Sequence, residues 1–337
     1  MDVTDEVWTV FDAYCGLGGF ACGALQALKE NEISNVRVVG VDSDKTPLEA
    51  FKKNVAAAGI KDVRTICKTI GTDEIEWPDE NGRLFIHWSP CCQPFSKARS
   101  ASPASPDAVA DGLKQIKLVL DLVISKGYKR WSIEEVSHPK VLALVQGYAT
   151  KHPKIVAFDV LDAVSYGCPS ERRRLIASSP SILQDIKSSV SVEFRPPKRA
   201  FDEAGIAPAS DFYRNGNVSC APRPISRPGF TVTASHPLVF CRPDRSLVRC
   251  MIPAESAALV GFPREWVLPL GVGAAQRAVG NAISPTMSRA IVTSGLRAAI
   301  CDEKVATETH ADGDFVTRKE VAEMIAAALA AAFEKHR

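Results

Sequence analysis

The chain has 337 residues, of which 46% are apolar and 24% charged, and its formal net charge is +2. This composition is typical of a globular protein with a substantial core and excludes a disordered chain. No apolar run approaches the roughly 20 residues that a membrane-spanning helix needs, so no membrane partner is expected. None of the ten cysteines shows C-x-x-C spacing and the six histidines are scattered, which predicts reduced thiols, a cytoplasmic protein and no metal site.

Short β-branched or aromatic runs alternate with helical patterns over roughly the first 180 residues. The strand-like runs are VWTVFDAY, VRVVGVD, RLFIHW, RWSIEEV and RRLIAS. This alternation predicts a parallel, doubly wound α/β sheet. From about Pro180 to Ser235 the chain is rich in Pro, Arg, Ser and Asn, which indicates a small, loop-rich insertion. Helical patterns return with AESAALVGF and MSRAIVTSGLRAAI.

A glycine-rich turn follows the first strand-like run, which ends in Asp12 and Tyr14. The turn contains Gly16, Gly18 and Gly19 and leads into a helical pattern. Glycine lets the backbone approach a ligand closely and adopt positive φ, so this turn predicts a cofactor site. A tight turn without a ligand has the same signature.

Asp42 ends the second strand-like run, VRVVGVD. Nucleoside-binding sheets place an acid at this point to hydrogen-bond ribose hydroxyls, about 20 residues after the glycine turn. The alternative is that Asp42 only caps the helix predicted for DKTPLEAFKKN.

Two adjacent cysteines lie in HWSPCCQPFSKARS, which runs from His87 to Ser100 at a strand exit. A thiol at a strand-to-loop edge can face a cleft and act as a nucleophile. The stretch KARSASPASPDAVADG that follows is small, polar and poorly periodic, which predicts a mobile active-site loop.

These motifs, in this order, resemble the S-adenosylmethionine-dependent cytosine-5 methyltransferase family. The family's nucleophile motif, Pro-Cys-Gln with Pro-Phe-Ser following, is matched by Cys92 and the residues after it. Cys91 replaces the family's proline, and we interpret it as a packed apolar thiol. Glu134-Glu135-Val136 corresponds to Glu-Asn-Val, YGCPSERRR to the paired-arginine motif, and AVGNAISP to the closing motif.

The resemblance implies a Rossmann-like class I methyltransferase sheet with a small target-recognition region. It implies that Cys92 adds to carbon 6 of a flipped-out cytosine in DNA while Glu134 protonates ring nitrogen 3. Arg174, supported by Arg172, would stabilise charge on the base carbonyl. The cofactor would be S-adenosylmethionine, and the residues implied to bind it are Asp12, Tyr14, Gly16, Gly18, Gly19, Asp42, Pro90 and Asn281.

The chain departs from the family pattern at three places. Glu135 replaces Asn, and two adjacent buried carboxyls should raise the pKa of one of them and favour a protonated Glu134. Ser170 stands where the family has Gln. After the third strand, Lys68 or Thr69 falls near the position of the family's adenine-binding Asp.

We predict four regions along the chain. Residues 1–178 form a catalytic and cofactor-binding domain, 179–248 a short target-recognition region, 249–300 a return segment, and 301–337 a linker with an amphipathic helix that packs on its own domain or self-associates. A short recognition region predicts few base contacts and a short target site. The candidate nucleic-acid contacts are Gln93, Ser96, Arg195, Lys198 and Arg199.

The resemblance implies duplex DNA as the partner, in a prokaryotic or virus-infected cell. A restriction endonuclease or a second copy of the chain is a further candidate partner. Two alternatives stay open: an RNA (tRNA-type) cytosine-5 methyltransferase, and a catalytically inactive DNA-binding homologue.

Overall fold

The computed structural model describes residues 7–80, 82–95, 104–190, 193–216 and 219–311, with only the backbone for residues 300–311. It divides into two compact units, residues 1–293 and 294–337. The second unit begins inside helix α9 (Pro285–Ala311), and the part of α9 from Ser294 onward is all of that unit that the structure describes.

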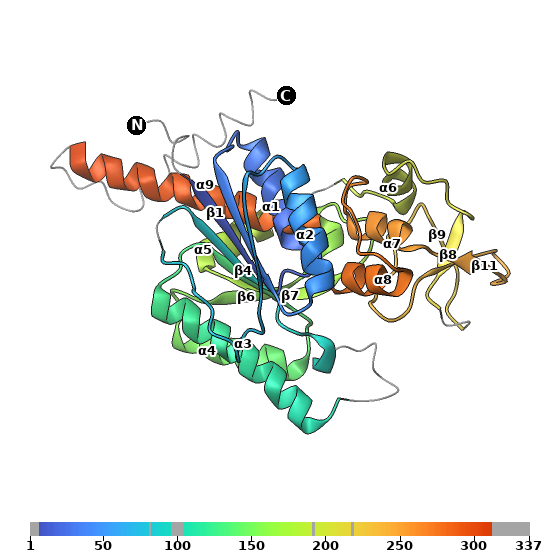
Figure 1. The fold of residues 1–337 in the computed structure, drawn as a ribbon, viewed down its shortest axis with the longest axis horizontal. Helices are drawn as coiled ribbons and strands as arrows, with labels where there is room; N and C mark the ends of the chain where they lie inside the picture. Colours follow the sequence, from blue (N-terminus) through green and yellow to red (C-terminus); the bar gives the residue numbers. More distant parts are fainter. Residues whose placement is uncertain (1–6, 81, 96–103, 191–192, 217–218, 312–337) are drawn as a thin grey trace. The chain divides into compact units, whose positions relative to one another are not determined.

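The first unit is built on a seven-stranded sheet with the order β3-β2-β1-β4-β5-β7-β6 (Figure 1). β1 pairs in parallel with β2 and β4, which makes it the point where the strand order reverses. Ligands of open α/β sheets bind at such a point, outside the carboxyl ends of the strands. The strands are β1 (Trp8–Ala13), β2 (Val36–Asp42), β3 (Asp62–Cys67), β4 (Leu84–Trp88), β5 (Trp131–Glu135), β6 (Ala157–Asp162) and β7 (Arg173–Ser178).

The expectation of a wholly parallel sheet is wrong for the run RRLIAS. This run forms β7, which pairs antiparallel with both β5 and β6. The connection from β6 to β7 is short and contains only the 3-10 helix η3 (Ala163–Tyr166), whereas a parallel crossover needs about a dozen residues or more. β6 escaped the sequence analysis because its residues are mostly half-buried and lack a clear alternation.

Helices cover both faces of this sheet. α1 (Gly19–Glu30) and α2 (Lys45–Ala57) lie on one face, and α3 (Pro106–Lys126) and α4 (Pro139–Lys151) lie on the other (Figure 1). Buried Ile116 and Val119 of α3 pack in one apolar cluster with Trp131 and Ile133 of β5. The smaller α5 (Pro180–Ser188) packs against β6 and β7.

Helix α3 corrects the prediction of a loop over residues 97–112. It begins at Pro106, and the hydroxyl of Ser105 accepts a hydrogen bond from the N–H of Ala108 at 3.2 Å. A serine cap followed by proline at the first helical position is a helix start signal that the low periodicity obscured. Residues 96–103, including the predicted contact Ser96, lie outside the described residues.

A second, four-stranded antiparallel sheet has the order β11-β10-β8-β9. Its core contains Phe201, Tyr213, Phe240 and Leu259, and the same cluster includes Leu17 of the glycine-rich turn. This cluster therefore contains residues from both parts of the unit and is separate from the cluster that joins α3 and β5. The elements here are α6 (Pro197–Glu203), β8 (Phe212–Arg214), β9 (Arg223–Pro224), β10 (Val239–Cys241), β11 (Leu247–Cys250), α7 (Pro253–Val260) and α8 (Val272–Asn281).

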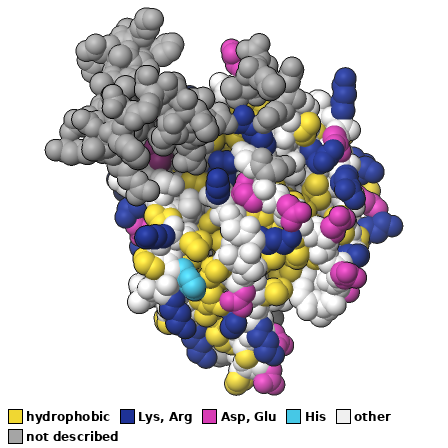
Figure 2. Space-filling model, turned by 90° about the vertical axis from the view of Figure 1, so that its left-hand side faces the viewer, with side chains coloured by type: hydrophobic (Ala, Val, Ile, Leu, Met, Phe, Trp, Pro, Cys, Tyr) yellow, Lys and Arg dark blue, Asp and Glu magenta, His cyan; other side chains and the backbone are white. Residues whose placement is uncertain are grey.

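The surface is mixed in character on the face that Figure 2 draws, where basic and acidic side chains are interspersed with apolar ones. Across the described ranges, no helix is both long and apolar enough to cross a membrane. In the same residues, no cluster of three or more His, Cys, Asp or Glu side chains could hold a metal ion.

Candidate active site

A cleft of about 320 Å³ opens at the carboxyl ends of β1, β2, β4 and β5, with α8 on its opposite wall. It brings together most of the residues that the sequence analysis singled out. Of the predicted residues, those lining the cleft are Asp12, Tyr14, Gly16, Gly19, Asp42, Pro90, Cys92, Gln93, Glu134 and Asn281. Gly18, Arg172 and Arg174 are not part of this lining.

The glycine-rich turn is shaped by close contacts and by the left-handed backbone at Gly16 (φ 48°) and Gly18 (φ 87°), the residue that precedes α1. A Cβ on Gly19 would lie 2.2 Å from the carbonyl oxygen of Ile283, so only glycine fits there. The indole N–H of Trp266 donates to the Leu17 carbonyl at 3.0 Å. The turn is therefore held against two segments from the end of the unit.

Asp42 is hydrogen-bonded to this turn. Asp42 accepts hydrogen bonds from the N–H groups of Gly16 and Asp44, both at 2.8 Å. Asp44, rather than Asp42, caps α2 by accepting from the Thr46 N–H at 2.9 Å. The capping alternative for Asp42 is therefore wrong, because the residue that caps the helix, Asp44, lies two positions later.

Asp12 is almost fully buried and accepts a bond from the N–H of Ala21 at 3.2 Å. Burial raises the pKa of Asp12 to about 8, the Ala21 bond opposes this, and the charge of Asp42 adds to it. Burial also raises the pKa of Asp42. A cation entering the cleft would stabilise the ionised form of both groups.

The cleft fits a positively charged nucleoside such as S-adenosylmethionine. Carboxyl groups of Asp12, Asp42, Asp44 and Glu134 line it, and they suit an ammonium or sulfonium group. Gly16 also lines the cleft, and a Cβ there would meet no described atom within 4 Å, so the backbone leaves open space for a ligand. Neither Lys68 nor Thr69 lines the cleft.

The two cysteines follow β4 and differ in exposure. Cys92 is half-buried and Cys91 exposed, although both line the cleft. The expectation of a packed Cys91 is therefore wrong: the chain turns after Pro90 toward the 3-10 helix η1 (Gln93–Phe95) and leaves the first thiol in solvent. Burial raises the pKa of Cys92 to about 12, with further contributions from the charges of Glu135 and Glu134.

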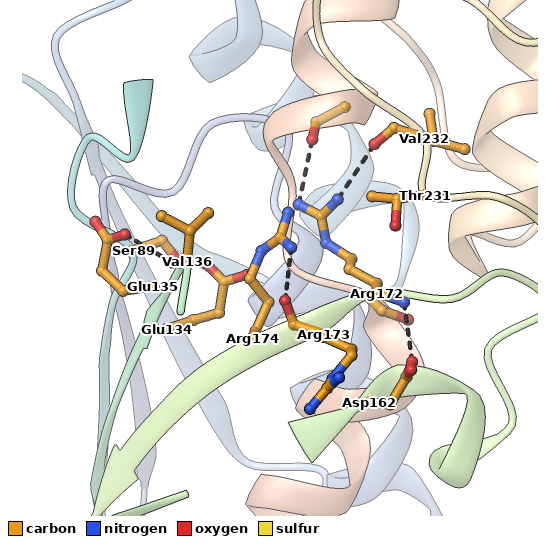
Figure 3. A network of polar contacts seen from close by, with 12 residues as sticks. Ser89, Glu134, Glu135, Val136, Asp162, Arg172, Arg173, Arg174, Thr231 and Val232 are labelled. Carbon is orange, nitrogen blue, oxygen red and sulfur yellow. Dashed lines mark hydrogen bonds and ion pairs between the residues drawn. The ribbon is translucent and has the colours of Figure 1, made fainter. Parts of the chain in front are cut away.

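Glu134 and Arg174 form a partly enclosed ion pair at 2.9 Å between Oε1 and Nε, on the paired strands β5 and β7. Figure 3 shows the two side chains pointing toward each other. Their exposed side-chain fractions are 5% and 15%, so water screens the pair weakly. Arg174 also donates to the Arg173 carbonyl at 2.9 Å, which orients its guanidinium.

Glu135 points away from Glu134 (Figure 3), as expected for neighbours on a β-strand. It is fully buried, and its Oε2 accepts from the Val136 N–H at 2.8 Å. Burial first, and then the charge of Glu134, raises the pKa of Glu135 well above its ordinary value. The sequence analysis expected one raised pKa in this pair of carboxyls, and Glu135 has one.

Arg172 is buried, and its side chain is hydrogen-bonded to backbone carbonyls of two distant segments. Its guanidinium donates to the carbonyls of Val232 at 3.4 Å and Gly280 at 3.2 Å. Burial, followed by the charge of Arg174, lowers the pKa of Arg172 to about 10. A Cβ on Gly280 would lie 2.2 Å from the Ala234 nitrogen, so this junction is tightly packed.

A buried histidine that the sequence analysis did not single out supports the floor of the cleft. His87 contacts the hydroxyls of Ser89 and Ser132, both at 2.8 Å, and stacks on Phe20 at 4.1 Å between ring centroids. Burial lowers its pKa to about 3, so the ring is neutral. Ser89 and Phe20 line the cleft. An isolated histidine inside a strand carries no motif, so the sequence offered no signal for this role.

The sequence analysis also missed two further cleft residues, Asp44 and Arg277, although the sequence contains patterns that could have identified them. Asp44 is the first residue of the predicted helical run DKTPLEAFKKN, where a cap is expected. Arg277 lies four residues before Asn281, and residues four apart share one face of a helix such as α8.

The predicted nucleic-acid contacts on and beside α6 are ion-paired. Arg199 contacts Glu193 at 2.7 Å and Glu203 at 2.8 Å, Lys198 contacts Asp202 at 3.4 Å, and Arg195 also pairs with Glu203. These carboxylates offset much of the positive charge. Phosphate binding by these three residues stays a prediction. Because carboxylates pair with their side chains, they carry less unpaired positive charge than the sequence indicated.

Comparison with known proteins shows the fold. No protein-family model matches the chain, and no curated protein matches it. Among solved structures, a protein described as a DNA modification methyltransferase encoded within an E. coli prophage has 15% identity and a TM-score of 0.59. That match covers 87% of this chain and 99% of the other.

Two further solved structures show the same relationship. The methyltransferase EhMeth of Entamoeba histolytica has 13% identity and a TM-score of 0.54 over 89% of this chain and 99% of its own. The Dnmt2 methyltransferase of S. pombe has 15% identity and a TM-score of 0.52 over 88% and 99%. The chain thus has the fold of class I methyltransferases, and the predicted fold class is confirmed. The resemblance to the cytosine-5 methyltransferase family is confirmed at the level of that fold.

Proposed function

We propose that this chain transfers a methyl group from S-adenosylmethionine to carbon 5 of a flipped-out cytosine in DNA. The observation that carries the proposal is the meeting of Cys92 and Glu134 in the cleft where the glycine-rich turn and Asp42 would hold the donor. The ion pair of Glu134 with Arg174 adds the third group that the chemistry needs.

Cys92 would supply the nucleophile. Carbon 5 of cytosine is weakly nucleophilic, and addition of a thiolate to carbon 6 moves an electron pair onto carbon 5. Because the pKa of Cys92 is raised to about 12, the group rests as a thiol, and its proton must leave to solvent as the base enters. The reactive thiolate would therefore form only when a base is bound.

Glu134 and Arg174 would stabilise the charge that the addition creates. Electron density moves toward ring nitrogen 3 and the carbonyl of the base. Glu134, which is ionised in its pair with Arg174, would take up a proton from solvent and pass it to nitrogen 3, and the guanidinium of Arg174 would stabilise charge at the carbonyl. Both would lower the barrier. When bound, S-adenosylmethionine supplies a methyl group on a sulfonium. After transfer, the carbon 5 proton would leave to solvent, the Cys92 sulfur would depart as a thiolate and nitrogen 3 would return its proton to Glu134, which restores the aromatic ring.

The alternatives differ in substrate or in activity, and one experiment separates them. The purified chain is incubated with methyl-tritiated S-adenosylmethionine and either duplex DNA or folded tRNA, and labelled cytosine is identified after digestion. We expect 5-methylcytosine in DNA. Label confined to RNA would favour the RNA methyltransferase, and binding of DNA without label in either substrate would favour the inactive homologue.

A further inference from the structure

The β10–β11 hairpin, residues 239–250, carries two exposed arginines at its turn. Arg242 and Arg245 flank Asp244, so the turn has two positive charges against one negative. Asp244 accepts from the N–H and the hydroxyl of Ser246, at 2.9 and 2.6 Å. Among the described residues, no ion pair within 4 Å joins either arginine to a carboxylate.

Apolar side chains are exposed next to these arginines. Leu247 exposes 55% of its surface and Val248 38%, both on β11. β11 is the outer strand of its sheet, and no described strand pairs with its far edge. The arginines can bind a negatively charged backbone, and the exposed apolar side chains can pack against its apolar parts. A nucleic acid offers both features.

The base of the hairpin is rigid, in contrast to its exposed turn. Arg249 donates to both carboxylate oxygens of buried Glu255, at 2.8 and 2.6 Å, and lies over the Phe240 ring at 5.0 Å. Arg245 holds a φ of 73°, a region that favours glycine. An arginine therefore occupies a position where glycine would have less backbone strain, next to the part of the hairpin that the Arg249–Glu255 pair holds in place.

We propose that the β10–β11 hairpin is a duplex-DNA contact of this chain. Arg242 and Arg245 bind backbone phosphates of the duplex, and Leu247 and Val248 pack against the neighbouring sugars. This inference rests on the proposed function and names the segment that holds the duplex. It assigns to the hairpin the phosphate contacts that the sequence placed on α6, where carboxylates already pair the basic residues.

The test measures binding of a labelled duplex over a series of salt concentrations. Each phosphate contact contributes about 0.9 to the slope of log K against log salt. We expect the double variant Arg242→Gln with Arg245→Gln to reduce the slope by about 1.8. Replacing Leu247 and Val248 by serine should weaken binding several-fold and leave the slope unchanged, because no charge is removed.

A matched control removes two charges elsewhere. Lys52 and Lys53 are exposed on α2 and form no ion pair with a described carboxylate, and their change to glutamine should leave the slope as in the wild type. Thermal unfolding and S-adenosylmethionine binding report whether each variant is folded.

Two outcomes would overturn the inference. One is a wild-type slope in the arginine double variant, and the other is an equal loss in the Lys52 and Lys53 control. Methyl transfer to DNA is measured in parallel. If the wild type methylates DNA and the hairpin variants bind it normally, the hairpin proposal alone fails. If the wild type neither binds nor methylates DNA, the proposed function fails as well.

Discussion

The cleft of the large sheet and the hairpin of the small sheet hold charged groups in opposite ways. Asp12 in the cleft and Glu135, the neighbour of the cleft residue Glu134, are buried, and the loss of water raises the pKa of both. At the hairpin, Arg242 and Arg245 face solvent, and the supporting pair of Arg249 with Glu255 lies beneath them. The enclosed carboxyls have shifted pKa values, whereas the arginines suited to a polyanion stay hydrated until it arrives.

This contrast predicts large effects for changes inside the cleft and moderate, salt-dependent effects for changes at the hairpin. A variant of a cleft residue should alter the rate of transfer with the duplex affinity nearly unchanged. A hairpin variant should do the reverse. Measuring both quantities for each variant tests whether the two regions are separable in function.

The largest effect on rate is expected for Glu134→Gln. The amide keeps the size of the side chain but cannot supply the proton to ring nitrogen 3, and it also breaks the ion pair with Arg174. Methyl transfer should fall by at least about 100-fold, the lower range for general acid catalysis. Duplex binding should change less than about threefold. A residual rate within about tenfold of wild type would show that another group acts as the acid.

A smaller effect, dependent on pH, is expected for donor binding through Asp12. With a pKa raised to about 8, Asp12 is mostly neutral at pH 7, and a cationic donor favours its ionised form. Affinity for S-adenosylmethionine should therefore rise about tenfold from pH 7 to pH 9, relative to Asp12→Asn measured over the same range. Calorimetric titration at several pH values makes this comparison. Parallel pH profiles for the two proteins would contradict it.

The same shift affects stability with a defined sign. Because the folded-state pKa of Asp12 lies above the ordinary value of 3.8, the stability it contributes is present below pH 3.8 and is lost as pH rises through about 8. Asp12→Asn should lack this loss, so its stability relative to wild type should improve with rising pH. Denaturant unfolding at pH 5 and pH 8 measures the difference.

The smallest effect is expected for Glu135→Asn. Glu135 points away from Glu134, and its carboxylate accepts a hydrogen bond from the neighbouring Val136 N–H, which an asparagine oxygen can also accept. Transfer should stay within about threefold of wild type. Removing a carboxyl whose charge raises the pKa of Cys92 should also speed alkylation of Cys92. A larger loss than that of Glu134→Gln would mean that the two roles are exchanged.

Much of the cleft could be predicted because its residues belong to short motifs at the ends of buried strands. The glycine-rich turn, Asp42 and Cys92 each follow a strand whose apolar run is readable. Interactions between distant segments could not be predicted, such as the contact of Arg172 with Gly280 or of Trp266 with Leu17.

The predictions that failed did so where a local pattern has two structural outcomes. Cys91 is small and apolar, but the turn after Pro90 exposes it. The run RRLIAS is a strand in either direction, and only the short connection from β6 decides that it is antiparallel. The sequence indicated unpaired basic residues near α6, but in the structure Glu193 and Glu203 form ion pairs with Arg199.

The most direct test of the account is covalent trapping with duplex DNA that contains 5-fluorocytosine, in the presence of S-adenosylmethionine. Fluorine at carbon 5 cannot leave as a proton does, so the cysteine adduct at carbon 6 persists and is seen as a complex that survives denaturation. The wild type and Cys91→Ala should both form it, and Cys92→Ala should not. An adduct that survives in Cys92→Ala, or one that is lost in Cys91→Ala with its fold intact, would contradict the assignment of Cys92 as the nucleophile.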